Sequence, residues 1–192
     1  VAEFWNRPSR KLKLIGVTGT NGKTTITFLL EYLLKKIGKK TALFGTLFNR
    51  WPGFSEEASH TTDFADKLQK KLNAAVEAES EFAILEVSSH SIAQNRISGC
   101  EFEAAIFTNL TQDHLDYHSD MESYFQTKRK LFFPPYLIEK DGISVLNHDD
   151  LWISKLSSDL EKRSSLVSTK ITKSEFKNDD FFYVTDKKFT ES

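Results

Sequence analysis

A glycine-rich turn between an apolar strand and an amphipathic helix constrains the fold of this chain most. Residues 16–25 read GVTGTNGKTT, and they begin within the last three residues of the apolar run at residues 11–18. Glycine allows tight turns that point successive backbone N–H groups into one concavity, and the following helix adds its positive dipole end. A chain with this segment is expected to build a βαβ unit and to bind phosphate there.

The strict GxxxxGK[ST] spacing is not met, because Val17 stands where the first glycine of that motif belongs. A shorter GxxGKT loop remains, in which Lys23 can reach the outer phosphates of a nucleotide and the Thr24 hydroxyl can ligate magnesium. The alternative is a glycine-rich turn with a coincidental Lys-Thr pair, and the flanking strand and helix argue against it. The predicted nucleotide-binding residues of the loop are Gly19, Thr20, Asn21, Gly22, Lys23, Thr24 and Thr25.

Hydrophobic periodicity predicts strands that alternate with helices. Strands are predicted at residues 11–18, 41–45, 82–87, 104–107 and 142–146, and helices at 23–37, 64–78, 121–132 and 151–160. This alternation predicts an α/β fold in which helices cover both faces of a mostly parallel sheet. Short strands near 166–168 and 181–185 are expected to form a small antiparallel extension near the C-terminus. A length of 192 residues fits one domain.

Composition and charge exclude several classes of protein. With 26 Lys and Arg against 27 Asp and Glu, the formal net charge of -1 gives no argument for a nucleic-acid or membrane partner. Cys100 is the only cysteine, which excludes a disulfide framework, and we expect it to be a small buried hydrophobe. No apolar run approaches the length of a bilayer span, and residues 1–13 lack the apolar core of a signal peptide. A cytoplasmic monomer is therefore expected.

An acidic residue ends the predicted strand at 82–87. Glu86 follows four apolar residues and lies near the carboxyl end of the strand, the edge where doubly wound sheets bind ligands. A carboxylate at this edge can hold the magnesium that bridges nucleotide phosphates, whereas the alternative is a solvated glutamate at a strand end. Arginine suits bidentate binding of a phosphate or carboxylate. The polar residues that follow Glu86 include Ser88, Ser89, His90, Gln94 and Arg96.

The loop after the predicted strand at 104–107 is dense in side chains that can bind ligands. Its sequence TNLTQDHLDYH contains Asn109, Asp113, His114, Asp116 and His118. The cysteines and histidines that a zinc site needs at matched spacing are not present, and a solvated polar loop is the alternative. Because the loop leaves the same sheet edge as the phosphate loop, a neutral His114 with nearby oxygens could hold a second magnesium. By composition alone, Lys128 with Arg129 and Lys130 indicates a basic helix face.

With GTNGKTT, EVSSH and TNLTQDHLDYH in this order, the chain resembles the central, ATP-binding domain of the Mur ligase family, most closely its MurE type. The resemblance extends from about Ser9 to Asp150. It implies a P-loop NTPase-like fold, ATP with two magnesium ions, and a UDP-muramyl peptide and an amino acid as substrates. The implied reaction adds the amino acid to UDP-N-acetylmuramoyl-L-alanyl-D-glutamate through an acyl phosphate, in peptidoglycan precursor synthesis. Residues 1–192 would then be this domain, incomplete at its C-terminal end, without the uridine-binding and C-terminal ligase domains.

The resemblance also implies roles for individual residues. Lys23 matches the phosphate lysine, and Thr24, Glu86 and His114 match magnesium ligands. Lys128 matches a lysine that carbon dioxide carbamylates, which turns a cation into an anion that binds metal. Together, Lys23, Glu86, His114 and Lys128 are the predicted catalytic residues. Further nucleotide-binding residues are Asn109, Asn147 and Asp150, and the positions that hold the UDP-muramyl peptide are Thr61, Thr62, Ser89, Gln94 and Arg96.

Two residues depart from the family pattern, and two alternative functions remain open. Asp63 stands where proline usually follows the paired threonines, and His60 stands where asparagine is common. One alternative is another ligase of the superfamily, such as cyanophycin or folylpolyglutamate synthetase, although EVSSH and DHLDYH favour the MurE type. The other is a nucleotide-binding fragment without catalytic activity, which would need neither the His114 loop nor Lys128. The added amino acid stays open between meso-diaminopimelate and L-lysine.

Overall fold

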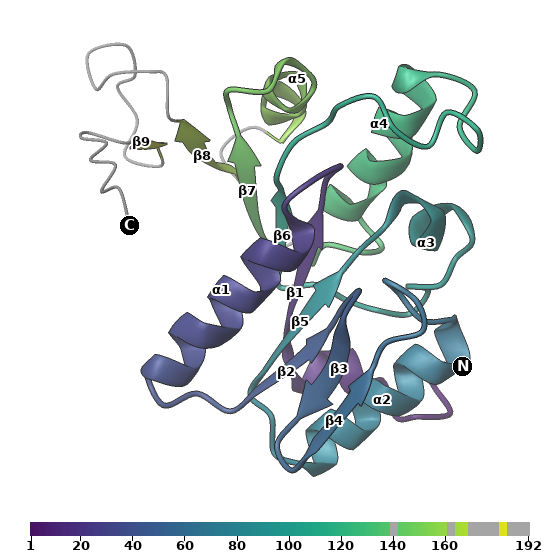
Figure 1. Cartoon of the computed structure of the whole chain (residues 1–192), viewed down its shortest axis with the longest axis vertical. Coiled ribbons are helices and arrows are strands. Elements are labelled where there is room, and N and C mark those ends of the chain that lie inside the picture. Colours follow the sequence, from purple (N-terminus) through teal and green to yellow (C-terminus); the bar gives the residue numbers. More distant parts are fainter. Residues whose placement is uncertain (139–141, 161–163, 169–180, 184–192) are drawn as a thin grey trace.

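The computed structural model describes residues 1–138, 142–160, 164–168 and 181–183. Within these residues, nine strands form one sheet in the order β4-β3-β2-β5-β1-β6-β7-β8-β9 (Figure 1). The strands are β1 (Lys13–Thr18), β2 (Thr41–Phe44), β3 (Phe48–Trp51), β4 (Phe54–Glu57), β5 (Phe82–Glu86), β6 (Ala104–Phe107), β7 (Ile143–Asn147), β8 (Ser164–Ser168) and β9 (Phe181–Tyr183). The α-helices are α1 (Lys23–Lys36), α2 (Ala65–Glu77), α3 (Ser89–Ala93), α4 (Met121–Arg129) and α5 (Leu151–Asp159).

The centre of the sheet is parallel, as predicted. Strand β1 pairs in parallel with β5 on one side and β6 on the other, and β2 pairs in parallel with β5. The predicted antiparallel extension near the C-terminus is wrong, because β7, β8 and β9 also pair in parallel. Helix α5 lies between β7 and β8 along the chain and returns it to the edge where β7 began, so β8 runs in the same direction as β7.

The antiparallel part of the sheet lies instead at its opposite edge. Strand β3 pairs antiparallel with β2 and with β4. The turn between β3 and β4 is Pro52-Gly53, in which Gly53 has a φ of +80°. Proline followed by glycine is a strong turn signal with this geometry, and it is the signal that could have predicted the hairpin.

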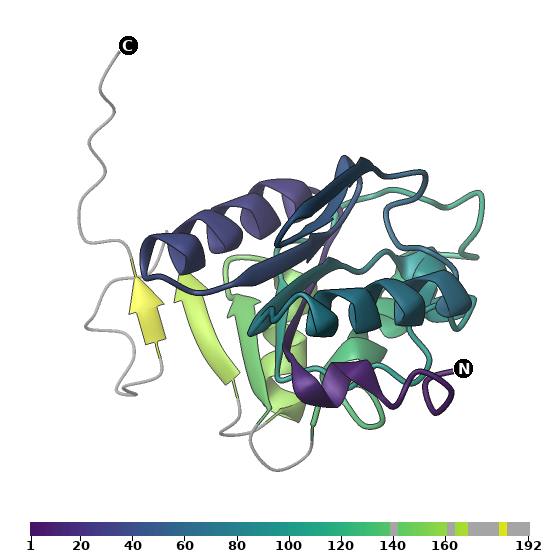
Figure 2. The same cartoon turned by 90° about the horizontal axis from the view of Figure 1, so that it is seen from below.

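Helices cover both faces of the sheet, which confirms the predicted fold class. Residues two apart in a strand share a face. On one face, side chains of β2, β5 and β6 join a buried core with α2, α4 and α5, made by Phe44, Leu68, Leu72, Leu85, Phe107, Tyr124, Ile153 and Leu156, among others. On the other face α1 contacts β1, β2 and β5, and Figure 2 shows it on the opposite side of the sheet from α2. None of the described helices has both the length and the apolar character that a bilayer span requires.

The parallel strands bring distant loops to one edge of the sheet. In the register of the sheet Val17 of β1 lies beside Glu86 of β5, and Thr18 lies beside Phe107 of β6. The glycine-rich loop after β1, the carboxylate at the end of β5 and the loop after β6 therefore lie together at the carboxyl edge, where α/β sheets bind ligands.

Candidate functional site

The glycine-rich loop between β1 and α1 depends on glycines with positive φ. Gly19 has a φ of +144°, and Gly22, with a φ of +82°, is the N-cap of α1. A Cβ atom on Gly19 would lie 1.9 Å from the Thr108 hydroxyl oxygen, so a side chain there would collide with the loop after β6. The loop leads directly into the N-terminus of a 14-residue helix, where backbone N–H groups and the helix dipole suit an anion.

The predicted phosphate lysine, Lys23, lies against this loop. Its Nζ donates to the carbonyl oxygens of Gly19 and Thr20, at 2.9 and 2.8 Å. Burial lowers the pKa of the Lys23 ammonium group, and the negative charges of Glu86 and Asp113 oppose that shift. The first residue of α1 thus brings a half-buried cation to the glycine-rich turn.

The loop after β6 clamps the glycine-rich loop. Asn109 accepts a hydrogen bond from the Asn21 backbone N–H at 2.9 Å, and its side-chain NH2 donates to the Asn21 carbonyl at 3.0 Å. The Thr20 backbone N–H donates to the Asn109 carbonyl at 2.9 Å. The structure therefore brings three predicted nucleotide-binding residues together. The Asn109 side chain holds the glycine-rich loop by binding the backbone of Asn21.

Glu86 and Thr24, the predicted magnesium ligands, are in contact. Glu86 is fully buried, and its Oε2 accepts from the Thr24 hydroxyl at 3.0 Å and the Thr46 hydroxyl at 2.9 Å. Its Oε1 accepts from the Thr46 backbone N–H at 3.0 Å. A buried carboxylate whose hydrogen-bond donors are all neutral suits a divalent cation. Sequence reasoning missed Thr46, although the Gly-Thr pair directly after β2, at the same sheet edge, was the available signal.

Lys128 of α4 reaches the glycine-rich loop from the opposite side. It is 1% exposed, so it is not part of the solvated basic face that composition alone indicates. Its Nζ donates to the Gly19 carbonyl at 3.0 Å, and Lys23 binds the same oxygen. Burial, and next the positive charge of Lys23, lower the pKa of Lys128 from 10.5 to about 7, against the opposing effect of Asp113.

His114 lies in a cluster of aromatic and imidazole rings. Its ring centroid is 4.8 Å from that of His90 and 6.0 Å from that of Tyr124, and its Nε2 is 3.4 Å from an Asp113 oxygen. Burial is the main cause that lowers the pKa of both His90 and His118. Among the described residues, no three His, Cys, Asp or Glu side chains converge on one point. Magnesium fits such a site better than zinc, because it retains water and binds phosphate oxygens beside one or two carboxylates.

A cavity of about 260 Å³ connects the predicted nucleotide and substrate residues. Its lining residues are polar or charged: Lys23, His60, Thr61, Thr62, Ser88, His90, Arg96 and His114. Of the predicted serines, Ser89 is buried at 1% exposure, whereas its neighbour Ser88 lines the cavity. Lys23, the predicted phosphate lysine, therefore lines the same cavity as Thr61, Thr62 and Arg96, which are predicted to bind the muramyl peptide.

Three of the predicted substrate residues, Thr61, Thr62 and Arg96, form one wall of this cavity. The Thr62 hydroxyl donates to the Glu86 carbonyl at 2.7 Å, and Arg96 Nη1 donates to the Thr62 carbonyl at 3.0 Å. Gln94 accepts from Arg96 Nε at 3.0 Å, and the guanidinium lies 4.3 Å from the centroid of the Phe64 ring. Hydrogen bonds thus link this wall directly to the strand that carries Glu86.

A family model for the Mur ligase middle domain matches residues 17–191. The chain belongs to the Mur ligase family. A UDP-N-acetylmuramoyl-L-alanyl-D-glutamate--2,6-diaminopimelate ligase from Prochlorococcus marinus subsp. pastoris is 96% identical over 192 residues, which are 100% of this chain and 38% of that protein. A protein of the same name from Synechococcus elongatus is 57% identical over 155 residues, or 81% of this chain and 31% of the relative. The chain thus spans roughly a third of the length of these relatives.

Solved structures share the fold of this Mur ligase domain. The structure of a UDP-N-acetylmuramoyl-L-alanyl-D-glutamate--2,6-diaminopimelate ligase matches with a TM-score of 0.73 and 34% identity, over 84% of this chain and 33% of that chain. Folylpolyglutamate synthase from Mycobacterium tuberculosis, complexed with ADP and AMPPCP, matches with a TM-score of 0.63 over 88% of this chain and 45% of that chain. Its 15% identity shows a common fold alone.

The departure from the Mur ligase pattern at residue 63 has a structural partner. Asp63 is 5% exposed and accepts a hydrogen bond from Lys71 of α2 at 2.5 Å. Its other oxygen lies 4.0 Å from Nδ1 of His60, the second unusual residue. In this Mur ligase an ion pair to α2, rather than the rigid ring of a proline, fixes the chain directly after Thr62.

Asn147 and Asp150, two of the predicted nucleotide-binding residues, tie β7 and α5 to the loop after β6. The Asn147 side chain donates to the Thr108 carbonyl at 2.8 Å. Asp150 accepts from the Leu110 backbone N–H at 2.7 Å and, as the N-cap of α5, from Trp152 N–H at 2.9 Å. Their contribution to nucleotide binding stays a prediction.

Replacement of Asp150 with alanine is expected to lower the free energy of unfolding by about 2 kcal/mol, since it removes an N-cap and leaves the Leu110 N–H unpaired. Urea unfolding of the 192-residue chain measures the change. Asp159→Ala is the matched control, because it removes only a surface ion pair with Arg129 and should cost about 0.5 kcal/mol. Equal losses in the two variants would contradict the capping role.

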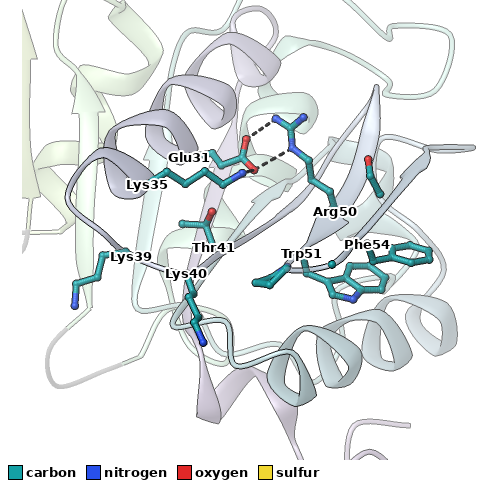
Figure 3. A pocket seen from close by; sticks show the side chains of 11 residues that line it. Glu31, Lys35, Lys39, Lys40, Thr41, Arg50, Trp51 and Phe54 are labelled. Atoms are coloured by element: carbon teal, nitrogen blue, oxygen red, sulfur yellow. Dashed lines mark hydrogen bonds and ion pairs between the residues drawn. The ribbon is translucent and has the colours of Figure 1, made fainter.

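A larger cavity, of about 550 Å³, lies away from these residues (Figure 3). It is lined from the C-terminal half of α1, the start of β2 and the β3–β4 turn, including Lys35, Thr41, Arg50, Trp51 and Phe54. Thr41 is the first residue of β2, so this cavity is at the amino edge of the parallel strands. By volume alone, this cavity would be chosen as the ligand site. The loops that carry the predicted functional residues, however, leave the opposite, carboxyl edge of the sheet.

Proposed function

We propose that this chain is the ATP-binding central domain of a Mur ligase that joins 2,6-diaminopimelate to UDP-N-acetylmuramoyl-L-alanyl-D-glutamate. The observation that carries the proposal is the shared cavity, because Lys23 and Arg96 line it together. A nucleotide held at the glycine-rich loop and a carboxylate held at Arg96 would meet within it. The names of the relatives at 96% and 57% identity supply the substrate and the amino acid.

Nucleotide binding in this proposal depends on the glycine-rich loop and on Lys23, Thr24 and Glu86. The N–H groups at the start of α1 bind the phosphates, and Lys23 turns from the loop carbonyls to the outer phosphate. Thr24 and Glu86 would hold magnesium, which neutralises phosphate charge during phosphoryl transfer. Their 3.0 Å contact brings a hydroxyl and a carboxylate oxygen close enough to serve one ion.

The acceptor side positions the D-glutamate carboxylate of the muramyl peptide along Thr61, Thr62 and Arg96. One carboxylate oxygen attacks the γ-phosphorus, the bond to the ADP oxygen breaks, and an acyl phosphate forms. The amine of diaminopimelate then attacks the acyl carbon, inorganic phosphate leaves, and the amine loses a proton. Positioning and charge neutralisation are the main contributions of the protein, because two anions must come into contact.

We propose that Lys128 becomes a carbamate in the active enzyme. Only a neutral amine attacks carbon dioxide, and a pKa of about 7 leaves a large neutral fraction at neutral pH. The product is an anion at the inner end of the site, and His114 together with this carbamate would hold a second magnesium ion. Carbamylation would also remove the repulsion between two ammonium groups that share the Gly19 carbonyl. A cytoplasmic location and a monomeric state stay predictions.

The proposal is tested by exchanging the 192 residues of this chain into the Prochlorococcus marinus ligase that is 96% identical to it, which we call the chimaera. ADP release is measured with UDP-N-acetylmuramoyl-L-alanyl-D-glutamate and diaminopimelate, each present or omitted. Release that requires both substrates, and that Glu86→Gln abolishes, is expected. Nucleotide binding without ADP release would identify a non-catalytic binding module. ADP release that does not depend on the muramyl peptide would contradict the proposed acceptor.

A further inference from the structure

Thr46, in the short turn between β2 and β3, donates two hydrogen bonds to the Glu86 carboxylate. The Thr46 backbone N–H donates to Oε1 at 3.0 Å, and the Thr46 hydroxyl donates to Oε2 at 2.9 Å. Because both oxygens are held from the same side, the carboxylate cannot rotate without breaking one of these bonds. Thr46 thus fixes the plane of the carboxylate, whereas Thr24 contacts only Oε2.

Gly45 gives the carboxylate room to reach this turn. A Cβ atom on Gly45 would lie 2.2 Å from Oε1 of Glu86, which is far inside van der Waals contact. The Gly45 N–H donates to the Phe48 carbonyl at 3.1 Å and so closes the turn. The Gly-Thr pair therefore works as a unit, in which the glycine admits the carboxylate and the threonine binds it.

An ion pair to a buried glutamate holds strand β3, which follows this turn, to α1, the helix after the glycine-rich loop. Arg50 of β3 reaches across to Glu31 of α1 and donates from Nε at 2.9 Å (Figure 3). The Glu31 side chain is 5% exposed, and the Arg50 guanidinium lies 4.7 Å from the centroid of the Phe28 ring. Since α1 also carries Thr24, the two hydroxyls that contact Oε2 belong to elements fixed to each other.

We propose that Thr46 is a positioning residue that presents Glu86 to magnesium and links it to the substrate wall. This inference rests on the proposed function of Glu86 as a magnesium ligand. The Thr46 hydroxyl oxygen lies 3.2 Å from that of Thr61, which lines the cavity. A hydroxyl has one hydrogen, so while Thr46 donates to Glu86 it can only accept from Thr61. The hydroxyls thus form a chain from the cavity to the carboxylate.

The test measures binding of the nonhydrolysable ATP analogue AMPPCP to the chimaera over a magnesium titration. Thr46→Val keeps the β-branched shape and the backbone N–H but removes the hydroxyl, and it should raise the magnesium concentration at half-saturation about tenfold. Thr46→Ser restores the hydroxyl and should stay within about twofold of the parent, since its hydrogen bond to the carboxylate is retained. Ser55→Ala, at an exposed position on the next strand, β4, is the control and should change nothing.

A double-mutant cycle identifies Glu86 as the route of the effect. In a Glu86→Gln background, Thr46→Val should cause no further loss of magnesium dependence, because the group it positions is gone. A valine variant equal to the parent, a serine variant as weak as the valine variant, or additive losses in the cycle would each overturn the inference. If AMPPCP binding by the parent chimaera did not respond to magnesium, the proposed function of Glu86 would fail with it.

Discussion

Replacement of Lys23 with alanine is expected to lower kcat/KM of the chimaera about a thousandfold, which corresponds to about 4 kcal/mol of transition-state stabilisation. The ammonium group lies within 3 Å of two carbonyl oxygens of the glycine-rich loop, at the start of the helix that would bind the phosphates. Charge on the transferred phosphoryl group is the main obstacle to reaction, and this variant removes a cation that lies against the loop. Steady-state ADP release at saturating muramyl peptide measures the effect.

Lys36→Ala is the matched control for Lys23→Ala. Lys36 is the last residue of α1 and is exposed, and its Nζ lies 5.3 Å from the centroid of the Tyr32 ring on the same helix. Removal of this charge should leave kcat/KM within about twofold of the parent. Lys36 is at the opposite end of α1 from the glycine-rich loop, and solvent and salt screen an exposed charge over that length of helix. Near-normal ligation by Lys23→Ala would show that the loop is not the phosphate site.

Replacement of Lys128 with alanine is expected to lower kcat by a factor of about a hundred to a thousand, since it removes an anion that would help to hold the second magnesium ion. Acetate or another short carboxylate should restore part of the activity, because the vacated space lies inside the protein beside the Gly19 carbonyl. Lys130→Ala is the control, since Lys130 is exposed and one residue beyond α4. ADP release with and without acetate measures both effects.

The same assay separates carbamylation from a role as a simple cation. Burial lowers the pKa of Lys128 to about 7, so the neutral amine that reacts with carbon dioxide becomes more abundant as pH rises. Activity of the parent chimaera should therefore depend on added bicarbonate more strongly at about pH 6 than at about pH 8. No rescue by acetate, together with full activity in solutions freed of carbon dioxide, would contradict the carbamate.

The sequence predicted the parts of the site that one strand or one loop encodes. Lys23 and Thr24 follow from the spacing of glycines before a helix, and Glu86 follows from the rule that ligands bind at the carboxyl ends of parallel strands. Contacts between elements could not be predicted, because local hydrophobic periodicity does not show which distant residues come into contact. The contact of Thr46 with Glu86 was missed for this reason, and the burial of Lys128 is equally invisible in a run of three consecutive basic residues at the end of α4.

The direction of the C-terminal strands shows a second limit. The Ser- and Thr-rich composition around β8 indicated short strands correctly but gave no information about direction, which depends on α5 before it. The hairpin of β3 and β4 could have been predicted from Pro52-Gly53. The contact of Thr46, in the preceding turn between β2 and β3, with Glu86 could not, since it joins residues 40 positions apart.

The carbonyl oxygen of Gly19 is shared by Lys23 and Lys128, which approach it from two different helices. Before Lys128 is carbamylated, and where both amines are protonated, two like charges on one acceptor repel each other, and an anion bound at the loop relieves that electrostatic cost. For this uncarbamylated form we expect nucleotide affinity to include the relief, and therefore to weaken when either amine is made permanently neutral without loss of its length. The loop is in this sense already biased toward an anionic ligand.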